Sequence, residues 1–160
     1  MRWKSLSGGK VADLQALVKA ATAGGQELHI GTDSLQTGKW TQFVTVVVTH
    51  TPGKGGRVVY ARDVVPRIKA LQERLFKEVW KSCEVAMSLA SVAGGEVTVH
   101  IDANPDEKHM SSKYIQSLVG LVMGQGFKYL VKPDAWAASH AADHVVRTKG
   151  KLPSRFSLVA

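Results

Sequence analysis

The first half of the chain carries three segments whose apolar and polar positions favour extended strands. The stretch 28–34 alternates in the way that turns successive side chains to opposite faces of a sheet. Residues 40–49 form a run of β-branched and aromatic side chains, and residues 57–65 resume this pattern until Pro66. The intervening segment 51–56 is dense in turn-forming residues. We therefore expect a hairpin that pairs with the first stretch, giving three antiparallel strands.

Elsewhere the apolar positions repeat mainly with the period of an α-helix. Helical spacing is found in four segments, at residues 10–22, 67–93, 111–123 and 135–147. Short strand patterns separate the later helices, at residues 96–102 and 127–131. The order of elements predicts an α/β fold with a mixed five-stranded sheet, in which three antiparallel strands are followed by two parallel ones and flanked by helices.

The length of the chain limits the number of domains. With 160 residues, of which 44% are hydrophobic, the chain can bury a substantial core but is short for two ordinary domains. We expect one domain over residues 1–160, with an N-terminal helical extension at residues 1–25 and a basic C-terminal tail at residues 148–160.

Charge and cysteine content bear on partners and location. Lys and Arg number 21 against 13 Asp and Glu, a formal net charge of +8, which suits a partner that carries phosphates. The single cysteine, Cys83, excludes an intramolecular disulfide and fits a reducing compartment. Neither a signal peptide nor a stretch of transmembrane length is apparent. We expect a cytoplasmic protein with no membrane association.

Two carboxylates are predicted to lie at the ends of neighbouring strands. Asp33 follows the apolar stretch at residues 28–30, and Asp102 closes the strand predicted at residues 96–102. Ligands of open α/β sheets bind where strand ends converge, and two acids placed there repel unless a cation neutralises them. An acidic metal pocket in a basic protein is what a phosphodiesterase acting on nucleic acid requires. The alternative is that Asp33 only opens a turn.

Two further acids are candidates for the same pocket. Glu78 falls at the edge of the apolar stripe of the long helix, from which it could reach a strand end; the alternative is an ion pair on the solvent face. Asp143 lies in the last predicted helix, among residues small enough for close packing.

Several stretches of the chain match a known pattern when they are taken in order. They are Ile30-Gly31-Thr32-Asp33-Ser34, His100-Ile101-Asp102, the glycine-broken residues 120–127, and the segment from Lys132-Pro133-Asp134-Ala135 to Ala142-Asp143. Together they resemble the YkuK-like family of predicted ribonuclease H-like nucleases, over roughly residues 5–147. One departure is Leu35, which stands where this family is expected to carry a polar residue such as glutamine.

The resemblance implies a fold, an activity and a set of metal ligands. It implies a ribonuclease H-like nuclease that hydrolyses phosphodiester bonds of RNA, RNA–DNA hybrid or DNA by a two-metal mechanism with Mg²⁺ or Mn²⁺. By resemblance, Asp33 would bridge the two ions, Glu78 and Asp102 would complete one site, and Asp143 would hold the other. The stretch His140-Ala-Ala-Asp143 also resembles the His-x-x-Asp of some RuvC-type junction resolvases, which makes His140 a further candidate ligand.

Two other functions remain open from the sequence. His140 and His144 lie one helical turn apart, and His100 and Asp102 share a strand face, which would suit a zinc-dependent hydrolase. A non-catalytic nucleic-acid-binding module of the same fold would instead use the basic tail and exposed aromatic side chains such as Trp3 or Trp136.

Overall fold

The structure is a computed structural model that describes residues 1–148, apart from the side chains of Ala138, Ser139, Asp143, Val146 and Thr148. The strands are β1 (Trp3–Ser5), β2 (Lys10–Val11), β3 (Glu27–Thr37), β4 (Trp40–Thr51), β5 (Gly55–Pro66), β6 (Val97–Ile101) and β7 (Lys128–Val131). The helices are α1 (Leu14–Ala23), α2 (Leu71–Ala90), α3 (Ile115–Gly124) and α4 (Asp143–Thr148), with a 3₁₀ turn η1 (Met110–Tyr114) and a π-helical segment η2 (Ala137–Ala142). Apart from the backbone of Thr148, the predicted basic tail lies outside the described residues.

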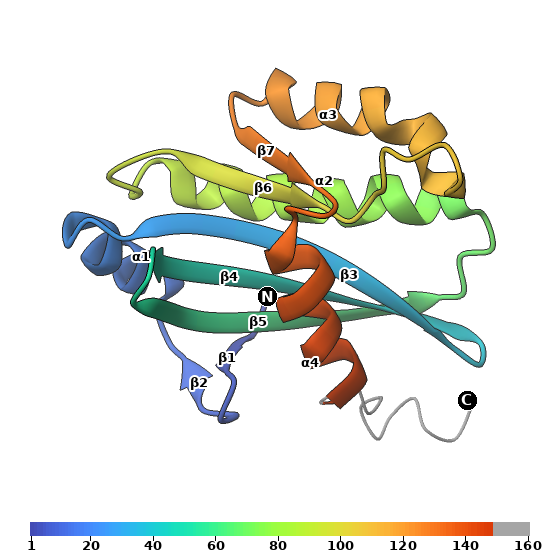
Figure 1. Ribbon diagram of the computed structural model, residues 1–160. Coiled ribbons are helices and arrows are strands. Elements are labelled where there is room, and N and C mark those ends of the chain that lie inside the picture. The colour runs from blue at the N-terminus through green and yellow to red at the C-terminus, as the bar shows by residue number, and fades with distance from the viewer. Residues whose placement is uncertain (149–160) are drawn as a thin grey trace.

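The strands form one mixed sheet with the order β2-β1-β5-β4-β3-β6-β7. Strands β3, β4 and β5 pair antiparallel, whereas β6 pairs parallel to β3, and β7 parallel to β6 (Figure 1). The helices α2 and α3 cross between the later strands, as the alternation of periods along the chain predicted. Three antiparallel strands followed by two parallel ones are thus found, as the sequence predicted.

The prediction of a five-stranded sheet is wrong, because the sheet has seven strands within residues 1–148. The two additional strands lie in the segment predicted as a helical extension, where β1 pairs with β5 through Lys4 and Tyr60, and β2 pairs with β1. These strands are three and two residues long, too short for an alternation of side chains to be visible in the sequence. The helix of this segment, α1, begins only after Asp13, whose carboxylate caps it by accepting from the Ala16 N–H at 3.0 Å.

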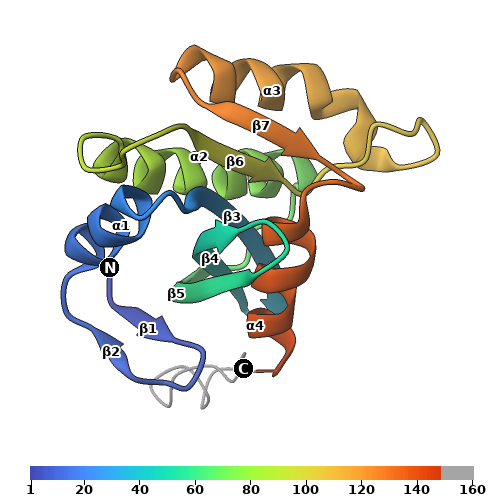
Figure 2. The same ribbon diagram turned by 60° about the vertical axis from the view of Figure 1, so that its left-hand side comes forward.

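Helices cover the sheet on both faces (Figures 1 and 2). Helices α1, α2 and α3 pack on one face against apolar side chains that include Leu28 and Ile30, and the segment formed by η2 and α4 packs on the other against Val44 and Val46. Successive side chains of a strand point to opposite faces, so β3 contributes to both layers. None of the described helices is long and apolar enough to span a membrane.

The larger core depends on α2, whose Leu89 is fully buried. We expect Leu89→Ala to lower the free energy of unfolding by about 3 kcal/mol, because it removes apolar contacts and leaves a cavity. For a chain of this size, that loss lowers Tm by roughly 6–12 °C in a thermal melt. The control is Met87→Ala, two residues earlier on the same helix. The side chain of Met87 is exposed, so this substitution should shift Tm much less. Equal effects of the two substitutions would contradict this packing.

Candidate active site

The register of the sheet brings two of the predicted carboxylates together. The parallel pairing of β3 with β6 ends at Gly31 opposite His100, and Asp33 and Asp102 each lie two residues beyond this pair. Asp33 is not at a strand end, as the sequence pattern suggested, because β3 continues to Thr37 with β4 as its partner on the other side. The edge that collects the carboxylates is therefore made by the end of β6.

Helix α2 supplies the third carboxylate, Glu78, which is buried. The hydroxyl of Ser34 donates to Oε1 of Glu78 at 2.5 Å. One turn further along α2, the hydroxyls of Ser82 and Thr32 lie 2.7 Å apart. Because residues i and i+4 share one helix face while alternate strand residues share one sheet face, these two contacts fix the position of α2 against β3. The sequence predicted Glu78 at the edge of the apolar stripe of this helix. In the structure its side chain is buried against β3.

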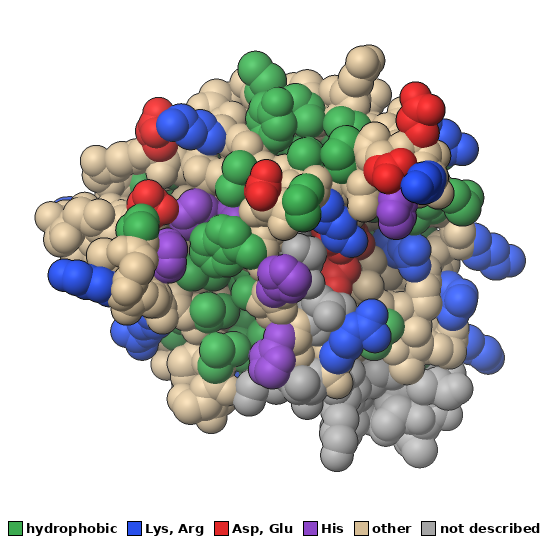
Figure 3. Space-filling view, in the orientation of Figure 1, with side chains coloured by type: hydrophobic (Ala, Val, Ile, Leu, Met, Phe, Trp, Pro, Cys, Tyr) green, Lys and Arg blue, Asp and Glu red, His purple; other side chains and the backbone are tan. Residues whose placement is uncertain are grey.

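The three carboxylates line one pocket of about 260 Å³. Its other walls come from β3, from the first half of α2 and from the loop that leads into η1; the lining residues are Asp33, Ser34, Leu71, Arg74, Leu75, Glu78, Asp102, His109, Met110 and Ser111. Figure 3 shows acidic side chains recessed beneath lysine and arginine side chains near the middle of this face. The pocket thus combines an acidic interior with a basic margin.

The electrostatics of the pocket disfavour ionised Glu78 in the absence of a cation. Burial is the main cause, and the carboxylates of Asp33 and Asp102 add to it, so that the pKa of Glu78 is raised well above its ordinary value. The hydrogen bond from Ser34 and the charge of Arg74 oppose this shift only in part. A positive charge placed among the three carboxylates would lower this pKa again.

Asp102 forms an ion pair with Lys132, which follows β7. Oδ1 of Asp102 lies 2.9 Å from Nζ of Lys132 in an ion pair, and no other hydrogen bond to this buried oxygen is found among the described residues. The lysine side chain is 38% exposed, so its ammonium can move away without losing a buried position. Sequence reasoning missed the roles of Lys132, Arg74 and Ser34, although Lys132 and Ser34 lie within the stretches that carry the family resemblance.

The donor set fits a hard divalent cation. Carboxylate oxygens are the ligands that Mg²⁺ and Mn²⁺ prefer, and Asp33, Glu78 and Asp102 offer them from three separate elements. The unfavourable charge on buried Glu78, to which Asp33 and Asp102 add, is relieved when a cation is bound. The residues present in the pocket are therefore suited to such an ion.

The structure places the remaining predicted ligands differently. Asp143 begins α4, but its side chain lies outside what the structure describes. His140 is exposed and lines a separate, mainly apolar pocket with His50, Trp136 and His144. His140 is thus not brought to the carboxylate pocket, because it belongs to the π-helical segment over β4 and not to the edge of β6.

The two pairs considered for zinc hydrolysis are not brought to one site, since His140 and His144 line the apolar pocket and His100 and Asp102 do not. His100 is fully buried, and burial lowers its pKa to about 3, whereas Asp102 faces the carboxylate pocket. Trp136 is half-buried and packs against histidine rings, with its ring centroid 4.9 Å from that of His100, so it is not the exposed aromatic that the sequence suggested. Trp3 is also half-buried and packs on the larger core.

Comparisons with known proteins found a matching family model and a similar relative. A family model described as "Ribonuclease H-like" matches residues 10–147. The chain is similar to the uncharacterized protein YkuK of Bacillus subtilis (strain 168), with 26% identity over 149 residues that cover 84% of this chain and 87% of that protein.

Two solved structures also resemble the chain. RNase H1 from the halophilic archaeon Halobacterium salinarum NRC-1 is 18% identical, with a TM-score of 0.45 over 76% of this chain and 98% of that one. The N-terminal RNase H domain of a Mycobacterium tuberculosis protein, solved as a fusion with maltose-binding protein, is 13% identical, with a TM-score of 0.41 over 78% of this chain and 99% of that one.

Proposed function

Because the chain belongs to the ribonuclease H-like family, as its resemblance to YkuK-like proteins predicted, we propose that it is a divalent-metal-dependent nuclease that hydrolyses phosphodiester bonds of nucleic acid. The observation that carries the proposal is the convergence of Asp33, Glu78 and Asp102 from β3, α2 and the end of β6 on one pocket. We further propose that residues 1–160 form one ribonuclease H-like domain and that it acts in the cytoplasm.

The proposed ligands follow the order of the chain. Asp33 would bridge two ions, Glu78 and Asp102 would complete one site, and Asp143, at the start of α4, would contribute to the other. Bound there, Mg²⁺ or Mn²⁺ would supply an activated water and stabilise the charge on the leaving oxygen. The raised pKa of Glu78 supports this assignment, since burial is its main cause and the charges of Asp33 and Asp102 add to it, so that a bound cation would stabilise the ionised group.

Neighbouring side chains prepare the pocket for a phosphodiester. Ser34 holds Oε1 of Glu78 at 2.5 Å and so fixes its orientation before a ligand arrives. Lys132, which is paired with Asp102, and Arg74, which lines the pocket beside Glu78, can bind a substrate phosphate at the margin. The net charge of +8 adds a longer-range attraction for nucleic acid that weakens as salt is added.

A substrate panel tests the proposed activity. We expect the full chain to cleave at least one of four labelled substrates (RNA, RNA–DNA hybrid, duplex DNA or branched DNA) with Mg²⁺ or Mn²⁺, and to lose cleavage when EDTA is added. Products are resolved on denaturing gels. Salt-sensitive binding of these substrates without cleavage under either ion would contradict the nuclease and favour the binding module of the same fold.

A further inference from the structure

A second group of ligating side chains lies at the opposite end of β3. Glu27 and His29 are two residues apart on this strand and therefore share one face. His50 of β4 is directly opposite Glu27 in the antiparallel register, which brings its side chain to the same face. Six residues of extended strand separate Glu27 from Asp33, about 20 Å, so this group is distinct from the carboxylate pocket.

The three side chains are spaced as the ligands of one ion. Oε2 of Glu27 lies 2.9 Å from Nε2 of His29 and 3.8 Å from Nδ1 of His50, and the three ligand atoms are all within 4.8 Å of one another. Ligand atoms around a tetrahedral Zn²⁺ are about 3.3 Å apart, given metal–ligand bonds of about 2.0–2.1 Å. Small side-chain shifts would thus bring all three into coordination.

His50 provides an independent indication of a ligand. Its Nδ1 is buried and makes no hydrogen bond within the part of the chain that the structure describes, although it lies near the carboxylate of Glu27. A buried ring nitrogen usually has a hydrogen-bond partner, and a bound cation would provide an equivalent one.

From this geometry we propose that Glu27, His29 and His50 bind one transition-metal ion of the Zn²⁺ class. Two imidazole nitrogens and one carboxylate form a borderline donor set that suits Zn²⁺ better than Mg²⁺. Three protein ligands leave a fourth position for water or another small ligand. This site differs from the two-ion site proposed among the carboxylates both in its position and in the chemistry of its ligands.

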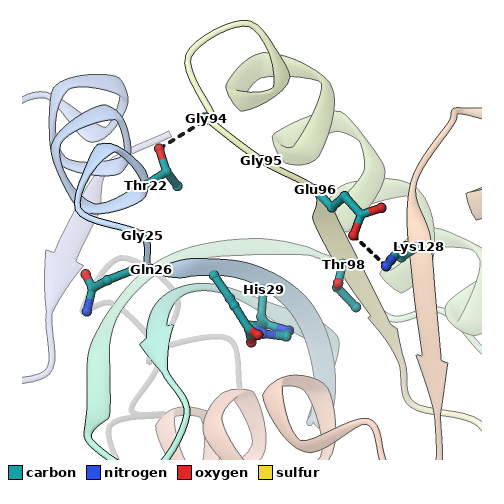
Figure 4. Close-up of a pocket in the computed structure, with 10 residues that line it drawn as sticks. Thr22, Gly25, Gln26, His29, Gly94, Gly95, Glu96, Thr98 and Lys128 are labelled. Atoms are coloured by element: carbon teal, nitrogen blue, oxygen red, sulfur yellow. Dashed lines mark hydrogen bonds and ion pairs between the residues drawn. The ribbon is translucent and has the colours of Figure 1, made fainter.

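Access to this site is through a surface pocket. Glu27 and His29 line a pocket between the end of α1, the loop before β6 and the start of β7, with three glycines in its wall at positions 25, 94 and 95. Figure 4 shows His29 at the base of this pocket, with the paired Glu96 and Lys128 on the far side of Thr98. An ion can therefore reach His29 without opening the core.

A second layer of side chains holds the histidine ring. Nδ1 of His29 lies 2.9 Å from Nε2 of His100, which burial keeps uncharged. For Nε2 of His29 to bind the metal, its proton must be on Nδ1, where His100 accepts it. The proton of His100 would then be on its Nδ1, where it can be donated to the backbone of Ala135. In the structure this Nδ1 instead accepts from the Ala137 N–H. Metal binding would therefore change the tautomers of both rings.

Trp136 covers the group on the side of the last helix. Its ring centroid lies 4.8 Å from that of His29 and 5.3 Å from that of His50. An apolar cover of this kind limits water at a metal site and strengthens its electrostatic interactions. Because Trp136 comes just before η2 and α4, an ion at this site would also fix the start of the segment that carries Asp143.

The test is metal binding by the full chain after it has been stripped with a chelator. We expect one equivalent of Zn²⁺ by calorimetry and elemental analysis, and visible absorption from Co²⁺ as a spectroscopic substitute. His50→Ala and Glu27→Gln are expected to weaken Zn²⁺ binding by about 100-fold or more, because each removes one ligand. These two side chains are partly exposed, so both variants should fold, as circular dichroism can verify.

Matched controls separate this site from its surroundings. Asp106→Asn, in the exposed loop after β6, and Glu73→Gln, in the exposed pair with Lys77 on α2, remove carboxylates elsewhere and should leave Zn²⁺ affinity unchanged. The proposal is overturned if the parent binds no Zn²⁺, or if His50→Ala binds it as tightly as the parent. It is also overturned if His140→Ala with His144→Ala abolishes binding while His50→Ala does not. None of these outcomes depends on nuclease activity.

Discussion

Asp33→Asn is expected to reduce metal-dependent cleavage at least about 1,000-fold, which corresponds to roughly 4 kcal/mol of transition-state stabilisation. The substitution removes the negative charge of the residue proposed to bridge both ions but keeps its shape. The oxygen of the neutral amide can still accept the hydrogen bond that the backbone N–H of Ser34 donates to the Asp33 carboxylate at 2.9 Å. We therefore expect the variant to keep the parental fold and to bind nucleic acid. Initial rates on the best substrate, with Tm and substrate affinity measured in parallel, test this.

Asp106→Asn is the matched control for Asp33→Asn. Asp106 is an exposed residue in the loop after β6, and its side chain accepts from the Lys108 N–H, which asparagine can also do. The same chemical change away from the pocket should leave cleavage unaltered. If Asp33→Asn cleaves as well as the parent, the carboxylate pocket is not the active site, whatever the substrate.

The fold could be predicted from the sequence wherever an element was long enough to show its period. Strands β4 and β5 and helix α2 lie within two to four residues of the predicted bounds, because each shows a run of β-branched residues or an apolar stripe. Strands β1 and β2 could not be predicted, since their pairing with β5 and with each other depends on tertiary contacts and not on a local pattern. The π-helical form of η2 could not be predicted either, because its residues have the same apolar spacing as an ordinary α-helix.

The candidate site could be predicted only in part, for a similar reason. Asp33 and Asp102 follow strand patterns, so their proximity could be inferred from the parallel pairing of two strands. The group of Glu27, His29 and His50 could not, because His50 lies 21 residues after His29 and only the register of the β3–β4 hairpin makes it a neighbour. A single-residue shift of that register would turn His50 to the other face of the sheet.

Glu78→Gln is expected to stabilise the metal-free protein at neutral pH while it reduces cleavage by about 100-fold or more. The pKa of Glu78 is raised in the folded protein, so the folded state binds this proton more tightly than the unfolded chain. The parent is therefore most stable with respect to this group below its ordinary pKa of 4.5, and loses stability as the pH rises from there through the folded pKa. Glutamine has no charge to lose and can still accept from the Ser34 hydroxyl.

Thermal melts in EDTA at pH 4 and pH 7 measure this difference. The variant should match the parent at pH 4 and exceed its Tm at pH 7, whereas added Mg²⁺ should raise the Tm of the parent more than that of the variant, because the ion binds the folded parent through Glu78. Glu73→Gln, five residues earlier on α2 in an exposed pair with Lys77, is the control and should show little dependence on pH or metal. A lower Tm for Glu78→Gln than for the parent at pH 7 without metal would mean that the carboxylate is stabilised in its charged form. Since the burial of Glu78 beside two other carboxylates is one reason to expect a cation there, that result would also weaken the assignment of the pocket as a metal site.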